Sequence, residues 1–209
     1  NEINDKYGIT RLLSHEETGN SWSYGRDKSV LRWCNSLKIQ WHEYPNNGVI
    51  RNLRNRDFWS KERNLRMRVP LSESPIFNSN IKYNGKIPTM KDIELNSREL
   101  ENRPIPGEYA AFEKLHYFLN TSGERYSKSI SSPTLSTKHG SGLSPYFTAG
   151  VLSMRRVVHE TSSRIEYIRN NKSQIKNHSI WIKSLTSFRK RLAWRCHFIQ
   201  KLETEPNLD

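Results

Sequence analysis

The chain has 209 residues, of which 34% are hydrophobic, and its 34 Lys and Arg against 21 Asp and Glu give a formal net charge of +13. The hydrophobic share is below that of an average globular domain, so we expect a thin core for this length. A charge this positive favours nucleic acid or an anionic cofactor as partner. The mean hydropathy of -0.84, with no apolar run near the ~18 residues of a membrane helix, excludes a membrane-spanning segment.

The two cysteines, Cys34 and Cys196, lie far apart, and no secretory leader precedes them. We therefore expect free thiols in a reducing compartment and a soluble, monomeric protein of the cytoplasm. Because the chain begins at Asn1 and its last residues directly follow a strong helical pattern, we expect both ends to be cut from a longer protein.

Residues 8–44 combine three patterns that are typical of an α/β sheet. A short apolar run from Gly8 to Ser14 predicts a buried strand that ends in a polar loop. Apolar residues at steps near three and four predict an amphipathic helix from Trp22 to Leu37. Alternation in residues 38–44, before Pro45, predicts a second strand. Strand, helix and strand within about 40 residues indicate a parallel crossover.

The next segments predict a basic helix and a linker. Residues 52–68 are helical in composition and very basic, and we expect a mostly solvated face with four anchors, namely Phe58, Trp59, Leu65 and Met67. Residues 69–106 hold five of the nine prolines with clustered Ser and Asn, which predicts a linker. The expected organisation is therefore an α/β part in residues 1–68, a linker in residues 69–106 and a helical part in residues 107–209.

Three helices are predicted in the second half, from Gly107 to about Leu119, from Val151 to Arg169 and from Trp181 to Leu202. The last has the longest amphipathic pattern, with apolar side chains at steps of three and four: Trp181, Leu185, Phe188, Leu192, Cys196, Ile199 and Leu202.

The loop from Gly140 to Gly150, GSGLSPYFTAG, is a candidate phosphate site. Ser144 is the predicted N-cap of a helix that starts near Pro145. The N–H groups of a helix N-terminus, with the hydroxyls of Ser141 and Ser144, are suitable donors to phosphate oxygens. The alternative is a purely structural helix cap after a flexible turn.

The last helix carries a second candidate. Arg191, Trp194, Arg195 and Phe198 are spaced i, i+3, i+4 and i+7, so they share one helix face. Aromatic rings stack on bases or flavins, and arginine pairs with phosphate. The alternative is that both rings widen the apolar stripe while the arginines are merely solvated.

Other chemistries lack support. His15 beside Glu16 and Glu17, and His42 beside Glu43, offer no second cluster for a metal, so we expect no metal site. His197 follows Cys196 directly, and adjacent helical residues point about 100° apart, so they form no nucleophilic dyad. Walker, GxGxxG and GxSxG motifs are absent from the sequence, which removes support for ATPase, dehydrogenase and esterase functions.

Three blocks, in order, resemble the photolyase/cryptochrome family of flavoproteins. They are SHEETGNSWSYGRDKSVLRWC (Ser14 to Cys34), GERYSKSISSPTLSTKHGSGLSPYFTAGVLSMRRV (Gly123 to Val157) and SLTSFRKRLAWRCHFIQKLE (Ser184 to Glu203). The resemblance implies a mixed fold, in which the remnant of an N-terminal, Rossmann-like α/β antenna domain precedes the first part of an all-α FAD-binding domain.

The resemblance also implies FAD, damaged DNA and a possible second antenna chromophore as ligands. The residues that match cofactor-binding positions are Tyr126, Gly140, Ser141, Gly142, Leu143, Ser144, Phe188 and Arg195. The residues that match DNA-facing positions are Arg191, Trp194, Arg195 and Phe198, and Trp194 is expected to pack on a flipped-out pyrimidine dimer.

Three positions depart from the family pattern. Gly140 lacks a hydroxyl and Gly142 lacks a side chain that many relatives have, although backbone donors can serve. Arg191 stands where dimer-repairing relatives carry a glutamate, and a guanidinium accepts no hydrogen bond from the lesion.

The expected activity is light-driven repair, in which reduced FAD passes an electron to a pyrimidine dimer. The alternatives are a cryptochrome-like blue-light receptor without repair activity, or a remnant that only binds nucleic acid through its basic surface. Because the family's residues beside the flavin ring follow the region that this chain covers, we expect the segment alone to bind FAD poorly and to be inactive.

Overall fold

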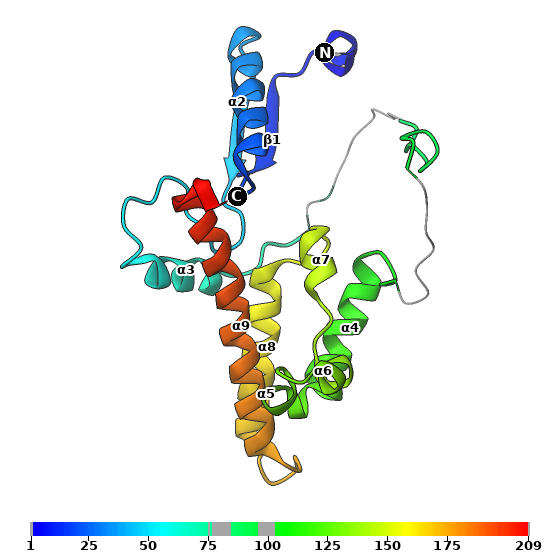
Figure 1. Ribbon diagram of the computed structural model, residues 1–209, viewed down its shortest axis with the longest axis vertical. Coiled ribbons are helices and arrows are strands. Elements are labelled where there is room, and N and C mark those ends of the chain that lie inside the picture. The colour runs from blue at the N-terminus through cyan, green and yellow to red at the C-terminus, as the bar shows by residue number, and fades with distance from the viewer. Residues whose placement is uncertain (1, 75, 77–84, 96–102, 209) are drawn as a thin grey trace.

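The computed structural model describes residues 2–74, 76, 85–95 and 103–208. A short helix, α1 (Glu2–Tyr7), precedes β1 (Arg11–His15), α2 (Ser21–Ser36) and β2 (Gln40–Tyr44). The two strands are parallel, with Arg11 opposite Gln40 and His15 opposite Tyr44. Figure 1 shows α2 running beside this sheet. The predicted strand, helix and strand are thus confirmed.

Local sequence explains these elements. The Asn20 side chain caps α2 by accepting a 3.1 Å hydrogen bond from the Ser23 N–H. The Trp41 indole donates to the Ser14 hydroxyl at 2.9 Å across the two strands. The expectation of a buried first strand is wrong, because alternate residues of both strands, Leu13 and Tyr44 among them, are exposed and the others are only half-buried. Among the described residues the sheet has only two strands, and the exposed residues of both strands lie opposite one another, so one face of the sheet is exposed.

Helix α3 (Trp59–Arg68) is shorter than its composition predicted, and most of its residues are exposed, as expected. It begins at Trp59 because Asn52 has a left-handed φ of 57° and the Asn55 side chain accepts from the Asp57 N–H in a local turn. Trp59 is a buried anchor as expected, whereas Phe58 is 70% exposed. Met67 is buried and Leu65 is exposed.

One basic side chain of α3 departs from the expected solvated face. Arg63 is buried, and its Nε and Nη2 atoms have no hydrogen-bond partner among the described residues.

The rest of the chain is helical. The described elements are α4 (Glu108–Asn120), the 3₁₀ turn η1 (Ser122–Arg125), α5 (Tyr126–Ser129), α6 (Pro133–His139), α7 (Ser144–Thr148), α8 (Met154–Asn170), α9 (His178–Thr204) and η2 (Pro206–Leu208). The three predicted long helices are confirmed, and three short helices lie in the region between them that is rich in Ser, Thr, Gly and Pro.

Helices α8 and α9 run antiparallel and pack together, and α3, α4 and α5 pack around them (Figure 1). The apolar stripe of α9 is buried as predicted from Trp181 to Cys196. The shared core is formed by buried side chains of these helices and their connections, including Trp59, Met67, Leu115, Phe118, Tyr126, Leu143, Tyr146, Val157, Ile165, Ile168, Trp181, Leu185, Phe188, Leu192 and Cys196.

The predicted linker lies partly outside the described residues. Its described residues between Val69 and Pro106 belong to no helix or strand. Helix α3 shares the helical core, and His159 on α8 contacts the Met67 carbonyl at 2.9 Å. The position of a domain boundary stays a prediction. No helix in the described part of the chain is long and apolar enough to cross a membrane.

Candidate functional site

The exposed face of α9 brings together three of the predicted residues. The Arg191 guanidinium lies 4.6 Å from the centre of the Trp194 ring, and the Trp194 and Phe198 rings are 6.3 Å apart with an interplanar angle of 81°. Trp194 is 53% exposed and Phe198 is 61% exposed. Neither ring widens the buried stripe, so both are available to a partner.

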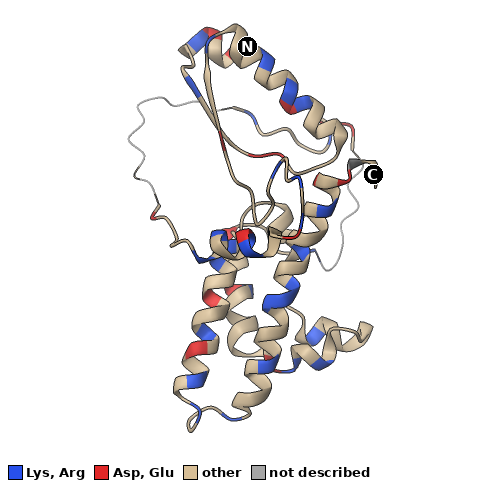
Figure 2. Cartoon of the chain, turned by 90° about the vertical axis from the view of Figure 1, so that its left-hand side faces the viewer, with Lys and Arg blue, Asp and Glu red and all other residues tan. Residues whose placement is uncertain are grey.

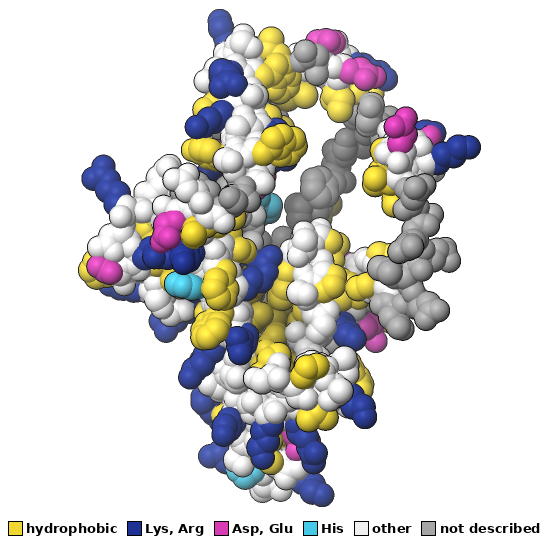
Figure 3. All heavy atoms as spheres, viewed as in Figure 1, with side chains coloured by type: hydrophobic (Ala, Val, Ile, Leu, Met, Phe, Trp, Pro, Cys, Tyr) yellow, Lys and Arg dark blue, Asp and Glu magenta, His cyan; other side chains and the backbone are white. Residues whose placement is uncertain are grey.

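The charge along α9 has one sign over most of its length. From His178 to Leu202 the helix carries Lys183, Arg189, Lys190, Arg191, Arg195 and Lys201 and no Asp or Glu. Figure 2 shows these basic bands, with acidic residues only near the end of the helix. Figure 3 shows hydrophobic and basic side chains gathered over the same helix. The surface therefore suits an anionic partner that has flat apolar groups.

Arg195 lies on a different part of the α9 surface from Arg191. Its guanidinium packs over the Phe147 ring at 5.5 Å and lines a cavity of about 740 Å³. The Nη1 atom of Arg195 is buried and has no hydrogen-bond partner among the described residues. Arg195 thus faces the cavity, whereas Trp194 faces the solvent.

The cavity lies where the carboxyl ends of β1 and β2 meet the helices. It is lined by His15, Glu17, Thr18, Gly19, Tyr44, Pro45, Asn46, Asn47, Arg66, Met67, Val69, Phe147, Thr148, Gly150, Leu152, Ser153, Met154, Arg155, Arg195 and Ile199. Ligands of open α/β sheets bind outside the carboxyl ends of the strands. Three arginines, Arg66, Arg155 and Arg195, and apolar side chains in the lining suit an anion with an apolar body.

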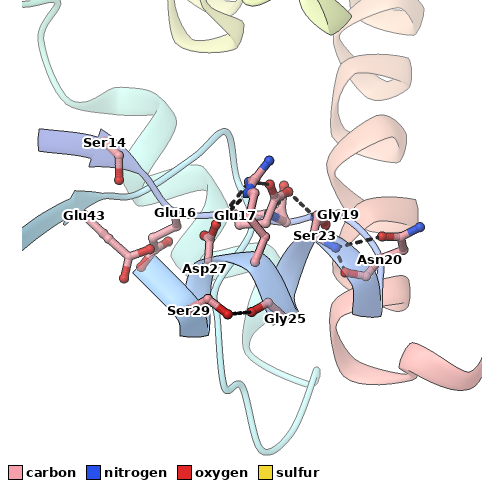
Figure 4. A network of polar contacts seen from close by, with 12 residues as sticks. Ser14, Glu16, Glu17, Gly19, Asn20, Ser23, Gly25, Asp27, Ser29 and Glu43 are labelled. Atoms are coloured by element: carbon pink, nitrogen blue, oxygen red, sulfur yellow. Dashed lines mark hydrogen bonds and ion pairs between the residues drawn. The ribbon is translucent and has the colours of Figure 1, made fainter. Parts of the chain in front are cut away.

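The one acidic side chain of the cavity wall is neutralised locally (Figure 4). Glu17 accepts from the backbone N–H groups of Thr18 and Gly19 at 3.0 and 2.7 Å and pairs with Arg26 at 2.6 Å. Arg26 also pairs with the buried Asp27 at 3.0 Å. These contacts fix the loop between β1 and α2 and leave the cavity positive.

Tyr126 and Phe188, predicted to contact the cofactor, lie together in the core. Their ring centres are 5.5 Å apart, and each also packs on Phe118. Burial raises the pKa of the Tyr126 phenol, and the positive charge of Arg191 partly opposes this rise. The charge of Arg191 therefore acts on both Trp194 and Tyr126.

Ser184 holds α5 and η1 against α9. Its hydroxyl donates to the Glu124 carbonyl at 2.6 Å and accepts from the Ser127 N–H at 3.2 Å. Since Ser184 is buried, these bonds fix the place of Tyr126 beside α9.

Residues 140–144 of the predicted phosphate loop do not line the cavity, whereas Phe147, Thr148 and Gly150 of the same loop do. Gly142 has a left-handed φ of 62°, and a Cβ atom there would lie 2.7 Å from Cε of Lys114. Leu143 is buried in the core, and its backbone is the N-cap of α7. The expectation that Ser144 caps the helix is wrong, because Ser144 is already its first residue and no side-chain cap is formed. Gly140 and Ser141 are half-buried.

Sequence reasoning missed two contacts that α4 and α9 make with distant segments of the chain. Lys114 on α4 reaches Gly142, and nothing in the sequence connects the two. Gln200 on α9 is 0% exposed and forms two hydrogen bonds with the Ile50 backbone, from the Ile50 N–H at 2.7 Å and to its carbonyl at 2.9 Å. The burial of Gln200 could have been predicted from its position, because it follows Cys196 by four residues and so continues the apolar stripe.

No protein-family model matches this chain, and no curated protein matches it. Within the described residues, no group of three or more His, Cys, Asp or Glu side chains could hold a metal ion. Cys34 and Cys196 are both buried free thiols, and burial raises the pKa of Cys34.

Proposed function

We propose that this chain acts in light-driven, FAD-dependent repair of pyrimidine dimers in DNA, as the photolyase/cryptochrome family does. The observation that carries the proposal is the exposed Trp194 ring beside Arg191 on a helix face without acidic residues. A flipped-out base needs a flat apolar surface to stack on, and the DNA strand needs cations beside it. The mixed fold, with a parallel β–α–β unit before a helical part, is compatible with the family's order of domains.

The loop at residues 140–144 fits the phosphates of FAD chemically. Ser141 and Ser144 carry hydroxyl donors, and the ammonium-bearing side chain of Lys114 adjoins Gly142. The fit at the flavin ring is weaker, because Tyr126 and Phe188 are packed against Phe118 in the core. When bound and reduced, FAD would supply the light-excited electron that opens the dimer. The protein would hold the donor and the lesion in place.

The cavity beside Arg195 is the best candidate for a second chromophore. Its lining combines the Phe147 ring and aliphatic side chains with Arg66, Arg155 and Arg195. A conjugated molecule with an acidic group fits this lining, since the rings can pack on apolar side chains and the acid can pair with the unpartnered Nη1 atom of Arg195.

Arg191 favours a second candidate function, a blue-light receptor without repair activity. Its guanidinium is exposed, stacks on Trp194 and has no salt bridge within the described part of the chain. A guanidinium donates hydrogen bonds and accepts none, so it cannot replace the glutamate that binds the dimer in repair enzymes. Such a site would still bind DNA phosphate.

The test is binding of a fluorescent duplex with one thymine dimer, compared in the dark with the same duplex undamaged. We expect tighter binding of the damaged duplex, and we expect Trp194→Ala to weaken that binding by roughly 1–3 kcal/mol. Trp22→Ala removes an indole from α2 that is even more exposed than that of Trp194, and it is the control. Equal affinity for damaged and undamaged duplexes would remove the basis of the proposal.

The variant Arg191→Glu distinguishes a DNA-repair function from a blue-light receptor function. If the chain serves repair, the glutamate should raise the preference for the damaged duplex, because it accepts hydrogen bonds from the lesion. An unchanged preference would favour the receptor. A fluorescence titration with FAD completes the test: we expect weak binding, and tight stoichiometric binding would contradict that expectation.

A further inference from the structure

The aromatic surface of α9 extends beyond the one ring that a flipped-out base would occupy. His197 is exposed, and its ring centre lies 5.7 Å from that of Phe198 and 5.6 Å from that of the buried Trp59. We call Trp194, His197 and Phe198 the aromatic ridge. Trp59 supports one end of the ridge from the core, and its indole donates to the Gly48 carbonyl at 2.9 Å. The ridge therefore rests on a fixed base.

The geometry of the ridge suits two bases rather than one. The Trp194 and Phe198 rings meet at 81°, so they cannot clamp a single flat molecule between parallel faces. Each ring is more than half exposed, so each has surface for its own stacking partner. Arg191 covers part of the indole at 4.6 Å and places a cation beside the base that would stack there.

Unpaired bases are the nucleic-acid groups that such rings can reach. In a duplex the base faces are stacked on one another and only the edges line the grooves, whereas a single strand presents the faces of successive bases. Aromatic rings along a basic surface are the usual platform for single strands. From His178 to Leu202 this helix carries six cations and no acid, which complements a strand of phosphates.

We propose that the aromatic ridge of α9 binds unpaired nucleotides, with one base on Trp194 and the next on Phe198, so that single-stranded DNA is the preferred form of the partner. The inference rests on the proposed function in taking DNA as the partner. It goes further because it applies to undamaged strands and requires neither light nor flavin.

The experiment measures fluorescence anisotropy of an undamaged oligo-dT of about 15 nucleotides and of a hairpin duplex of equal length, with the whole 209-residue chain in the dark. We expect the single strand to bind at least about 10-fold more tightly at the same salt. Trp194→Ala and Phe198→Ala should each weaken binding of the single strand by about 10-fold. Trp194→Phe, which keeps a ring, should retain most of the affinity.

The controls separate stacking from charge and from folding. Trp22→Ala and Tyr109→Ala each remove an exposed ring far from the ridge in sequence, on α2 and α4, and should bind as the parent chain does. Arg191→Gln should lower the slope of log affinity against log salt by about 0.7, the contribution of one phosphate contact to a single strand.

Any one of three results would overturn the inference. The duplex binds as tightly as the single strand, both alanine variants of the ridge keep full affinity for the single strand, or poly-glutamate binds as tightly as oligo-dT. The two proposals fail separately: a preference for dimers without a preference for single strands defeats this inference alone, and the reverse result defeats lesion recognition alone. Absence of binding to any nucleic acid defeats both.

Discussion

Replacing Gln200 by alanine should destabilise the chain by about 2–4 kcal/mol. Gln200 is fully buried and exchanges two hydrogen bonds with the Ile50 backbone, at 2.7 and 2.9 Å. Its removal leaves the Ile50 N–H and carbonyl without these partners, and an unsatisfied buried group costs about 1–3 kcal/mol. Because Ile50 is only half-buried, water can reach part of its backbone, which sets the expected loss in the lower half of the summed range.

Urea unfolding followed by circular dichroism measures this loss, with an unchanged m value as the sign that the folded and unfolded states are comparable. Gln200→Leu keeps the volume and loses both bonds, so it separates hydrogen bonding from packing. Gln174→Ala, at an exposed position in the turn before α9, is the control and should stay within about 0.5 kcal/mol of the parent. A loss below about 1 kcal/mol for both Gln200 variants would refute the reasoning.

Three further outcomes are expected. Ser184→Ala should cost about 1–3 kcal/mol in thermal unfolding, because the Glu124 carbonyl loses its 2.6 Å donor. Gly48→Ala should cost about 1–3 kcal/mol in the same assay, because its Cβ would lie 3.2 Å from the buried Cys196 sulfur and against Arg63. The raised pKa of Tyr126 means that the folded chain holds the phenolic proton more tightly than the unfolded chain, so stability should fall as pH rises above about 10. Tyr126→Phe should reduce that alkaline loss, and an identical pH profile would contradict the assignment.

The parts of the fold with regular apolar spacing could be predicted from the sequence. The β–α–β unit has clear alternation between helical and strand periods, and the stripe from Trp181 to Cys196 repeats at steps of three and four. The start of α3 could not be predicted from the sequence. The turn at residues 52–58 depends on the left-handed φ of Asn52 and on a side-chain hydrogen bond within the loop, whereas the composition of these residues is typical of a helix. Burial of Arg63 is likewise a tertiary effect that composition cannot reveal.

The candidate site could be predicted only as residue types on one helix. Spacing placed Arg191, Trp194 and Phe198 on one face, but it could not decide whether the rings point into the core or into solvent. Arg195 faces the cavity, whereas Arg191 faces the solvent. This difference depends on where α7 packs, and nothing in the sequence near either arginine indicates it. Lys114 was missed because its contact with Gly142 joins segments that are distant in the sequence.

Two buried side chains of α9, those of Ser184 and Gln200, hold other segments of the chain at a fixed distance from each other along the helix. Ser184 binds the η1 and α5 segment at one level, and Gln200 binds the loop at Ile50 about 24 Å further along the axis. A single inserted or deleted residue between them would rotate one anchor by about 100° relative to the other, so both bonds could not form together. Substitutions in this stretch should therefore be tolerated far better than any change in its number of residues.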